Sequence, residues 1–347
     1  MSTCTSTKSS SRRARLSRPW VAALLEGGLA LALGLHGASA ALAPAAPAPP
    51  SLIVVPSSLA SRNTTIEPSG VVWAGPLDRY LVVSDDTGNE TDKHEPWLFA
   101  MTRQGAFDAT PVPILGVTEL NDPESICSGP DGTFFLTTSH SLNKKGHLKP
   151  ARRRLLHLKL EGRALRVLGM IDLTLVVDAK GRGILAIAGV DPNGMLDIEA
   201  LTYQKDALLI GLKAPLTAHG DAAILRLSSP VQALHAGRVA PGQLTLFRQV
   251  PLGVSRPHGT IGRGISDMTG LPDGSIVLLA NSPKGMPSDG GGGIYWLKPG
   301  TSAPLLLHDF PGLKPEGVTP AADAKGFVLV FDNDFRPPSW TRWPLPQ

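Results

Sequence analysis

The chain has 347 residues, of which 42% are hydrophobic and only 5% aromatic, so the core of one large domain would consist mainly of Val, Leu and Ile. Gly (37) and Pro (32) are abundant without a collagen-like period, which predicts many turns. The net charge of +4 comes from the first forty residues, and the remainder is neutral, so the charge is no argument for a nucleic-acid partner and none is expected. Only Cys127 follows that segment, which excludes an internal disulfide or a zinc site of paired cysteines.

Residues 1–40 are expected to be a removable signal peptide. A Ser- and Arg-rich stretch precedes an apolar run, Val21 to Ala40, whose last three residues, Ala38-Ser39-Ala40, have the small-x-small form of a cleavage site. Ser11-Arg12-Arg13 partly resembles a twin-arginine signal, so both Sec and twin-arginine export stay open. Glu26 within the apolar run argues against an uncleaved anchor. We expect an exported protein, periplasmic or secreted, with no membrane span after cleavage and a Pro/Ala linker at 41–50.

A four-stranded motif recurs about five times over residues 51–347. Each copy has an acidic or small polar residue, apolar residues, a turn, and an apolar strand that ends in polar residues. The turns Pro130-Asp131-Gly132 and Pro272-Asp273-Gly274 are strong hairpin signals, because Asp and Gly tolerate positive φ. Two more strand-like runs follow each hairpin, which is typical of propeller blades. The copies begin at Pro68-Ser69-Gly70-Val71, Pro123-Glu124-Ser125-Ile126, Ile198-Glu199-Ala200-Leu201, Ser266-Asp267-Met268-Thr269 and Pro315-Glu316-Gly317-Val318.

The sequence therefore predicts an all-β fold, a single β-propeller domain over residues 51–347. Five blades is the direct count, and six is possible if the gap between Leu160 and Asp197 hides a degenerate unit. The last unit ends after its third strand, Trp340 to Trp343, so the run at Ser51 to Val55 would supply its outer strand and close the propeller. A closed propeller needs no partner, so we expect a monomer. A β-sandwich with coincidental similarity is the alternative.

At one position of the aligned copies four of the five residues are acidic, and this predicts a metal site. In a propeller the innermost strands begin around one mouth of the central channel. Carboxylates gathered there must protonate, pair with Arg or Lys, or bind a cation, and an all-oxygen set suits Ca²⁺ or Mg²⁺. The alternative is that they accept hydrogen bonds from neighbouring backbone. The aligned residues are Ser69, Glu124, Glu199, Asp267 and Glu316, and the predicted ligands are the four acids; Glu67, Asp122 and Asp197 lie two residues earlier and face the same way.

Polar residues at the ends of the second strands predict a ligand site near the same mouth, although turn chemistry explains them equally well. Lys213 and Arg263 lie close to the acidic motifs in sequence, so they would orient an anionic group or neutralise the carboxylates. The predicted substrate-binding residues are Asp85, Asp86, Lys213, Arg263, Asn281, Asp332 and Asp334. No metalloprotease, Walker or nucleophile-elbow motif is present, so no catalytic residue can be named.

Four phrases together resemble the bacterial DUF3616 family, a group of unknown function, over roughly Ile66 to Asp334. The Glu-Gly-Val element is also similar to motifs of phytase-like esterase, SdiA-regulated and gluconolactonase-type propellers. Such relatives imply a propeller and sometimes a divalent cation in the channel, with Glu316 and Asp267 as ligands. Ala200 and Lys213 depart from the Gly and Arg common in the family. The phrases are Ile198-Glu199-Ala200-Leu201, Ile210-Gly211-Leu212-Lys213-Ala214-Pro215, Gly262-Arg263-Gly264-Ile265-Ser266-Asp267 and Lys314-Pro315-Glu316-Gly317-Val318.

Two functions of different kinds follow from these observations. The first is a divalent-cation-dependent hydrolase of phosphate esters, esters or lactones at the channel mouth. The second is a non-catalytic module that binds a small anionic ligand or an extracytoplasmic protein, peptide or glycan. Propellers host both, so whether the protein is an enzyme stays open at this point.

Overall fold

The computed structural model describes residues 49–59, 66–87, 94–288, 290–332 and 337–345, all of which belong to one compact unit, Pro44–Gln347. The predicted signal peptide, most of the linker and Asp334 lie outside the described residues. Among the described helices, none is long and apolar enough to cross a bilayer.

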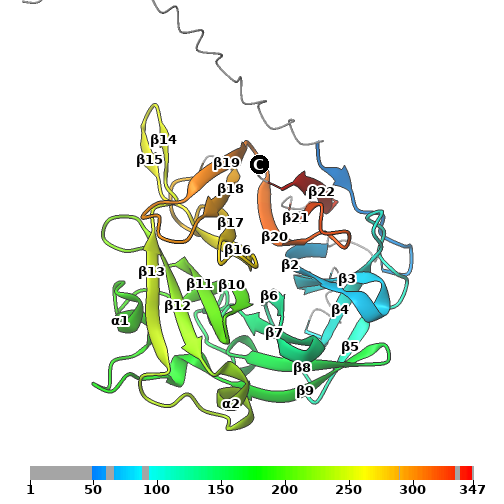
Figure 1. Ribbon diagram of the computed structural model, residues 1–347, viewed down its shortest axis with the longest axis horizontal. Helices are drawn as coiled ribbons and strands as arrows, with labels where there is room; N and C mark the ends of the chain where they lie inside the picture. Colours follow the sequence, from blue (N-terminus) through cyan, green and yellow to red (C-terminus); the bar gives the residue numbers. More distant parts are fainter. Residues whose placement is uncertain (1–48, 60–65, 88–93, 289, 333–336, 346–347) are drawn as a thin grey trace, which may run out of the picture. The chain divides into compact units, whose positions relative to one another are not determined.

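The unit is built from antiparallel four-stranded meanders arranged as a β-propeller, which confirms the prediction of an all-β propeller (Figure 1). The first meander is β2 (Ile66–Ala74), β3 (Arg79–Thr87), β4 (Trp97–Met101) and β5 (Val112–Leu115); the second is β6 (Pro123–Ser128), β7 (Thr133–Thr138), β8 (Leu155–Glu161) and β9 (Ala164–Ile171). The third is β10 (Asp197–Gln204), β11 (Ala207–Ala214), β12 (Ala222–Ser228) and β13 (Leu244–Val250); the fourth is β16 (Gly264–Gly270), β17 (Ile276–Asn281), β18 (Gly292–Leu297) and β19 (Leu305–Phe310).

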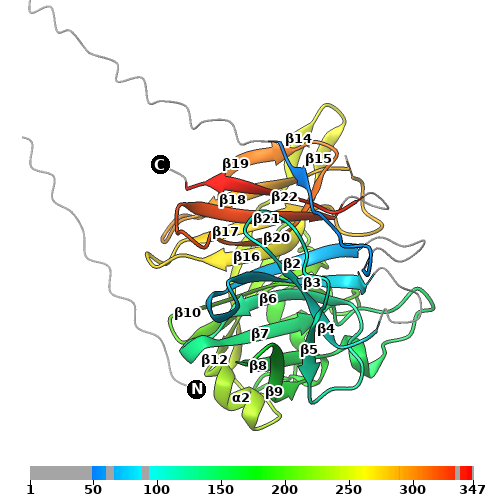
Figure 2. The same cartoon turned by 90° about the vertical axis from the view of Figure 1, so that its right-hand side faces the viewer.

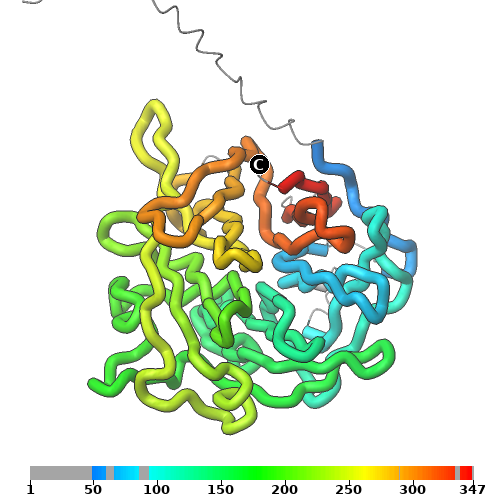
Figure 3. Tube along the Cα trace, in the orientation of Figure 1, coloured from blue at the N-terminus to red at the C-terminus, as the bar shows by residue number. Residues whose placement is uncertain are grey.

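The last sheet combines both ends of the described chain. It consists of β20 (Lys314–Pro320), β21 (Gly326–Asp332), β22 (Ser339–Pro344) and β1 (Ser51–Leu52), in that order. Ser51 of β1 lies opposite Trp340 of β22. In Figure 3 the blue start of the described chain accordingly runs beside the red end. A parallel pairing of β5 with β9 joins the first two meanders into one eight-stranded sheet.

Short elements fill the connections between these strands. A hairpin of β14 and β15 precedes the fourth meander, α1 lies between β9 and β10, and α2 lies between β12 and β13. Their bounds are β14 (Val254–Arg256), β15 (Gly259–Ile261), α1 (Ile184–Ala188) and α2 (Pro230–His235), with 3₁₀ turns at Gly75–Leu77, Pro130–Gly132, Pro150–Arg152 and Leu173–Leu175.

The local sequence explains the hairpins that begin each meander. Asp131 and Gly132, the Asp-Gly pair between β6 and β7, have φ of 53° and 73°, in the left-handed region that these residues tolerate. The strand after this turn, Thr133–Thr138, is buried at every position, because neighbouring sheets cover both of its faces. The prediction of hairpins from Asp-Gly turns is thus confirmed here.

The first strands of the meanders, β2, β6, β10, β16 and β20, lie innermost and touch one another around the axis, with β20 returning to β2 (Figures 1 and 2). Glycine allows the closest approach. A Cβ on Gly70 would lie 2.8 Å from the Glu124 carbonyl oxygen, and one on Gly317 would lie 2.9 Å from the Gly70 Cα. The axis is therefore tightly packed at this level, and polar side chains gather where the inner strands begin, an end we call the mouth.

Every inner strand carries a β-bulge close to its start. The register shifts fall between Pro68 and Gly70, Pro123 and Ser125, Ile198 and Ala200, Ile265 and Asp267, and Pro315 and Gly317. The bulged residues are therefore Ser69, Glu124, Glu199, Ser266 and Glu316. A bulge re-aims the side chain it carries. The sequence alignment was thus wrong by one residue in the fourth copy, where Ser266 and not Asp267 is equivalent to the glutamates.

Candidate functional site

Three carboxylates from two neighbouring inner strands converge at the mouth. Oxygen atoms of Glu124 on β6 and of Asp197 and Glu199 on β10 all lie within 4.8 Å of one another. We call these three residues the carboxylate triad. Asp197 and Glu199 are two residues apart, and Glu199 and Glu124 are both bulged, so strand alternation and bulging together aim the three side chains at one point.

Burial and mutual repulsion make the triad hard to ionise. Burial raises the pKa of Glu124 well above its ordinary value, and Asp122, Glu199 and other acids raise it further. Burial also raises the pKa of Glu199 well above normal. The pKa of Asp197 is raised to about 7, mainly by burial, although the charge of Lys213 acts in the opposite direction. Such a group favours either protons or a bound cation.

Lys213 on β11 is the counter-charge nearest to the triad. Its Nζ lies 2.5 Å from Glu199 Oε2 and 3.7 Å from Glu316 Oε2. Burial alone would lower the pKa of Lys213, but the carboxylates of Glu199 and Glu316 raise it above its ordinary value, so the ammonium stays charged. Lys213 was predicted to bind substrate or neutralise carboxylates, and its contacts are those of a counter-ion.

Glu316 lies beside the triad and is held by polar neighbours. Burial raises the pKa of Glu316, while Lys213, Lys314 and a hydrogen bond with Asn281 lower it. Asn281 is buried and also donates from Nδ2 to the Pro315 carbonyl oxygen at 3.4 Å. Lys314 in turn contacts Asp332 at 3.0 Å. Of the predicted residues, Asn281 and Asp332 therefore belong to the wall of the mouth.

A second acidic group adjoins the triad around Asp85. Burial raises the pKa of Asp85 well above its ordinary value, and the carboxylates of Glu67, Asp122 and Asp332 raise it further. Asp85 also donates its backbone N–H to Ser69 Oγ at 3.3 Å. Asp86 follows Asp85 in β3, but its side chain lies outside the described part of the chain.

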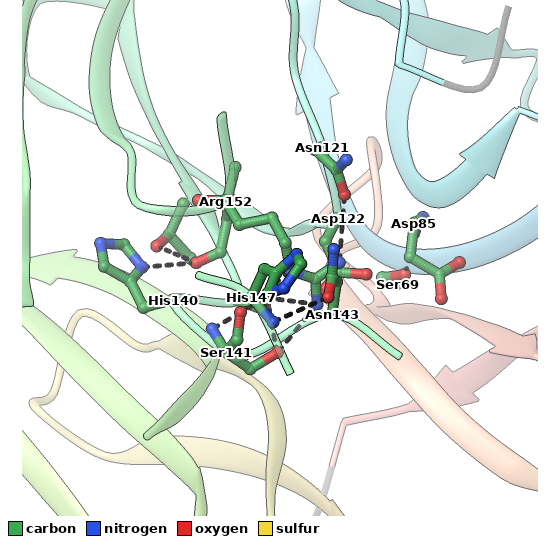
Figure 4. A network of polar contacts seen from close by, with 12 residues as sticks. Ser69, Asp85, Asn121, Asp122, His140, Ser141, Asn143, His147 and Arg152 are labelled. Carbon is green, nitrogen blue, oxygen red and sulfur yellow. Dashed lines mark hydrogen bonds and ion pairs between the residues drawn. The ribbon is translucent and has the colours of Figure 1, made fainter. Parts of the chain in front are cut away.

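Arg152 organises the edge of the mouth next to this second group (Figure 4). It pairs with Asp122 and donates to Ser139 Oγ at 3.1 Å and Ser141 Oγ at 2.8 Å. His140, between the two serines, is buried, and its Nδ1 lies 2.7 Å from the Thr138 carbonyl oxygen. Burial lowers the pKa of His140 to about 4, so this imidazole is neutral and supports the loop.

Asp267 does not join the carboxylate triad. It is only 1% exposed, and its two oxygens accept hydrogen bonds from Ser125 Oγ at 2.8 Å and from the Val318 N–H at 2.7 Å. Asp267 therefore fastens β16 to β6 and to β20 across the packed axis. The bulge at Ser266 explains this position, because it turns Asp267 one residue out of register with the glutamates.

Arg263 is also placed differently from the sequence prediction. The side chain is 0% exposed, and its Nη2 lies 2.7 Å from Asp309 Oδ1 while Nη1 donates to Tyr295 OH at 3.2 Å. A fully buried guanidinium cannot orient a substrate at the mouth, so the prediction for Arg263 is wrong. Its partner, Asp309, comes from β19, too far along the chain for sequence reasoning to pair the two.

Sequence reasoning did not assign Asp197 or Asp122 as functional residues, although it noted both. The available signal was strand alternation, which places a residue two positions before each glutamate on the same face. Among the predicted metal ligands, the structure brings together Glu124 and Glu199, keeps Glu316 beside them through Lys213, and separates Asp267. Metal binding by these residues stays a prediction.

One cavity lies beside the mouth, and another lies at the opposite end of the inner strands. The first, of about 430 Å³, lies among α1, the loop after β7 and the segment before β10. The second, of about 470 Å³, lies at the β6–β7 turn and α2, where His157 Nδ1 is 3.2 Å from His235 Nε2. Leu196 in the lining of the first cavity directly precedes Asp197 of the triad, whereas the second cavity meets β10 at Tyr203, near the far end of that strand.

The fold and the site together indicate the class of protein. It is a β-propeller whose inner strands bring carboxylates together at one mouth. Within this class, the model of the phytase-like family, described as esterase-like activity of phytase, matches residues 67–335, and the chain belongs to this family. The resemblance to phytase-like domains is confirmed. The family description indicates a hydrolase-type propeller. No curated protein matches the chain.

Solved structures with low identity also align with much of the chain. A gluconolactonase from Xanthomonas campestris is 14% identical, with 87% of this chain and 99% of that chain covered at a TM-score of 0.38. Regucalcin from Agrobacterium tumefaciens, a calcium-binding protein, is 9% identical, with 85% and 96% covered at 0.40. The allergen Mala s 1 of Malassezia sympodialis is 9% identical, with 80% and 74% covered at 0.42.

Proposed function

We propose that the protein is a divalent-cation-dependent hydrolase that cleaves phosphate esters, carboxylic esters or lactones at the mouth. The observation that carries this proposal is the carboxylate triad, three oxygen donors within 4.8 Å of one another on rigid inner strands. Membership of the phytase-like family supports hydrolysis as the activity.

The triad fits a hard cation. Ca²⁺ binds oxygen ligands at about 2.3–2.6 Å, so oxygens on opposite sides of the ion lie about 5 Å apart, close to the spacing here. Glu124, Asp197 and Glu199 would therefore hold Ca²⁺ or Mg²⁺. A bound divalent cation supplies polarisation of the scissile carbonyl or phosphoryl group and a more acidic water.

The surrounding residues have separate roles in this proposal. Lys213, which stays charged, keeps Glu199 in place and offsets part of the negative charge. Burial and the neighbouring carboxylates raise the pKa of Asp85 well above normal, which favours its protonated form, so Asp85 is the candidate donor to a leaving group. Arg152 fixes Asp122 between these two parts of the mouth.

We also propose that the propeller has five blades, that β1 closes it, and that the mature protein is exported as a monomer. The closed series of contacts among β2, β6, β10, β16 and β20 supports five blades. The pairing of β1 with β22 supports closure at the N-terminal strand. Export depends on the sequence of residues 1–40, and membership of the DUF3616 family stays a prediction.

The direct test is Ca²⁺ titration of the protein without residues 1–40, by calorimetry at pH 7.5. We expect saturable binding that Glu124→Gln and Glu199→Gln each weaken at least ten-fold, because each substitution removes a charged oxygen ligand. Asp191→Asn, an exposed carboxylate outside the mouth, is the matched control and should bind normally.

Hydrolysis of p-nitrophenyl phosphate, p-nitrophenyl acetate and a lactone would then be compared with Ca²⁺ and with EDTA. Cation-dependent turnover that is lost in Glu124→Gln would support the proposal. The absence of binding of Ca²⁺, Mg²⁺ and Mn²⁺ by the wild-type protein would refute it and favour a non-catalytic binding module.

A further inference from the structure

The apolar cavity beside the mouth has the properties of a substrate pocket. Its volume of about 430 Å³ is within the range of roughly 300–1,000 Å³ common to small-molecule sites. Leu142 and Met195 line it and remain 42% and 51% exposed, so large apolar side chains face the opening. The remaining lining is mostly apolar and includes Leu148, Ile184, Leu185 and Leu196, together with His140.

This apolar cavity shares its wall with the acidic mouth. Leu196 lines the cavity, and the next residue, Asp197, belongs to the carboxylate triad. His140 lines the cavity, and the serines on both sides of it bind Arg152, which pairs with Asp122. Figure 4 shows this order, with His140 on one side of Arg152 and Asp122 and Asp85 on the other. The cavity and the carboxylate triad therefore adjoin at the start of β10, where Leu196 is followed by Asp197.

The charges around the mouth disfavour a phosphorylated ligand. Lys213, Lys314 and Arg152 are each paired with a carboxylate, and Arg263 is buried against Asp309. Among the described residues, phosphate oxygens entering the mouth would face several carboxylates and cationic side chains already engaged by carboxylates, so an anionic ligand would depend on the bound metal ion alone. Exposed lysines occur on the loop at 144–149, but none of them lines the cavity.

We propose that the apolar cavity binds the acyl chain of an uncharged carboxylic ester or lactone and so sets the substrate class of this site. The inference rests on the proposed hydrolase function. The cavity lining carries no formal charge, which suits an aliphatic chain, while the ester group reaches the triad. Burial of each methylene group should raise kcat/KM about four-fold until the cavity is filled.

Chain-length kinetics test this proposal. The substrates are p-nitrophenyl acetate, butyrate, hexanoate and octanoate, with Ca²⁺ present, and the variants are Leu142→Asp and Met195→Asp. We expect the octanoate-to-acetate ratio of kcat/KM to exceed fifty in the wild type and to fall at least ten-fold in both variants. The matched control is Leu305→Asp on β19, where a leucine is 57% exposed far from the cavity lining, and it should keep the wild-type ratio.

A binding measurement separates this inference from the proposed function. Octan-1-ol is titrated by calorimetry in EDTA, where no turnover occurs, into the wild type, Leu142→Asp and Leu305→Asp. Octanol binding that is lost only in Leu142→Asp supports the acyl pocket even if no ester is cleaved. Ester hydrolysis without chain-length preference, hydrolysis of p-nitrophenyl phosphate alone, or equal octanol binding by all three proteins would overturn the acyl pocket and leave the cation-dependent activity intact.

Discussion

Replacing Asp197 by Asn should stabilise the cation-free protein, which is the opposite of what most substitutions do. The pKa of Asp197 is raised to about 7 in the folded chain, from 3.8 as the ordinary value. A carboxyl with a raised folded-state pKa contributes its full stability below pH 3.8 and loses that contribution as the pH rises through about 7. Asn cannot ionise, so the free energy of unfolding of the variant should rise relative to that of the wild type as the pH rises through this range.

The magnitude follows from the same shift. About three pKa units at roughly 1.4 kcal/mol each give a ceiling of about 4 kcal/mol at pH 8. Asp197 is only partly buried, so solvent screening reduces the gain, and we expect about 1–3 kcal/mol. The difference between variant and wild type should grow from pH 4 to pH 7 and then level off.

Urea unfolding in EDTA at pH 4, 5, 6, 7 and 8 measures this difference. The control is Asp191→Asn, which removes an exposed carboxylate and should show no such pH dependence. Added Ca²⁺ should reverse the order of stability at pH 8, since the wild type retains all three triad carboxylates. An Asp197→Asn protein that is less stable than the wild type at pH 8 in EDTA would refute the cost of ionising Asp197, which burial and then the neighbouring carboxylates impose.

Three other substitutions test the surroundings of the mouth. Lys213→Met should destabilise the cation-free protein by about 3–5 kcal/mol in urea unfolding, because Glu199 loses its partner at 2.5 Å, and Ca²⁺ should restore part of the loss. Arg263→Met should lower stability by about 1–3 kcal/mol, since Asp309 loses a buried partner but keeps Arg256, while the Kd for Ca²⁺ stays within two-fold. Gly317→Ala should lower stability by about 1–3 kcal/mol, because its Cβ would meet the Gly70 Cα at 2.9 Å; an unchanged melting temperature would show that the inner strands can separate.

The strands could be predicted from sequence because their signals are local. Alternating apolar runs and Asp-Gly turns predicted the repeating meanders, and the run beginning at Ser51 was expected to pair with the last sheet, where β1 does pair with β22. Glu124 and Glu199 could be placed at one mouth because equivalent positions of a repeat meet around an axis. These inferences needed only the period of the strands and the repeat.

The sequence predictions were wrong where contacts between distant parts of the chain determine the position of a side chain. A bulge has no reliable sequence signature, and Ser266-Asp267 offers two polar residues, so the alignment chose the acid that lies one residue too far along. Arg263 lies close to the acidic motif of β16 in sequence, but its partner Asp309 lies on β19 and comes next to it only after folding. Asp197 could not be identified as a metal ligand from sequence, because the positions of the side chains around it are set only by folding.

Asp267 and Glu124 are equivalent in the sequence alignment, but the bulge at Ser266 places them differently. Their substitution should therefore have opposite effects on stability and on the Kd for Ca²⁺. Asp267→Ala leaves the Ser125 hydroxyl and the Val318 N–H without their acceptor in the packed axis, so we expect a loss of about 2–4 kcal/mol in urea unfolding. The Kd for Ca²⁺ should stay within two-fold, since both Asp267 oxygens are engaged inside the protein. Glu124→Gln should instead raise this Kd at least ten-fold while stability at pH 8 stays equal or increases.

Calorimetry and unfolding on the same two variants give the comparison. A folded Asp267→Ala protein that no longer binds Ca²⁺ would restore the original alignment and place the cation deeper along the axis. The expected separation of effects would mean that the same repeated strand serves two purposes. Its bulged residue faces the mouth and bears the chemistry, whereas the residue after the bulge closes the axis, where only small side chains or one satisfied carboxylate can be accommodated.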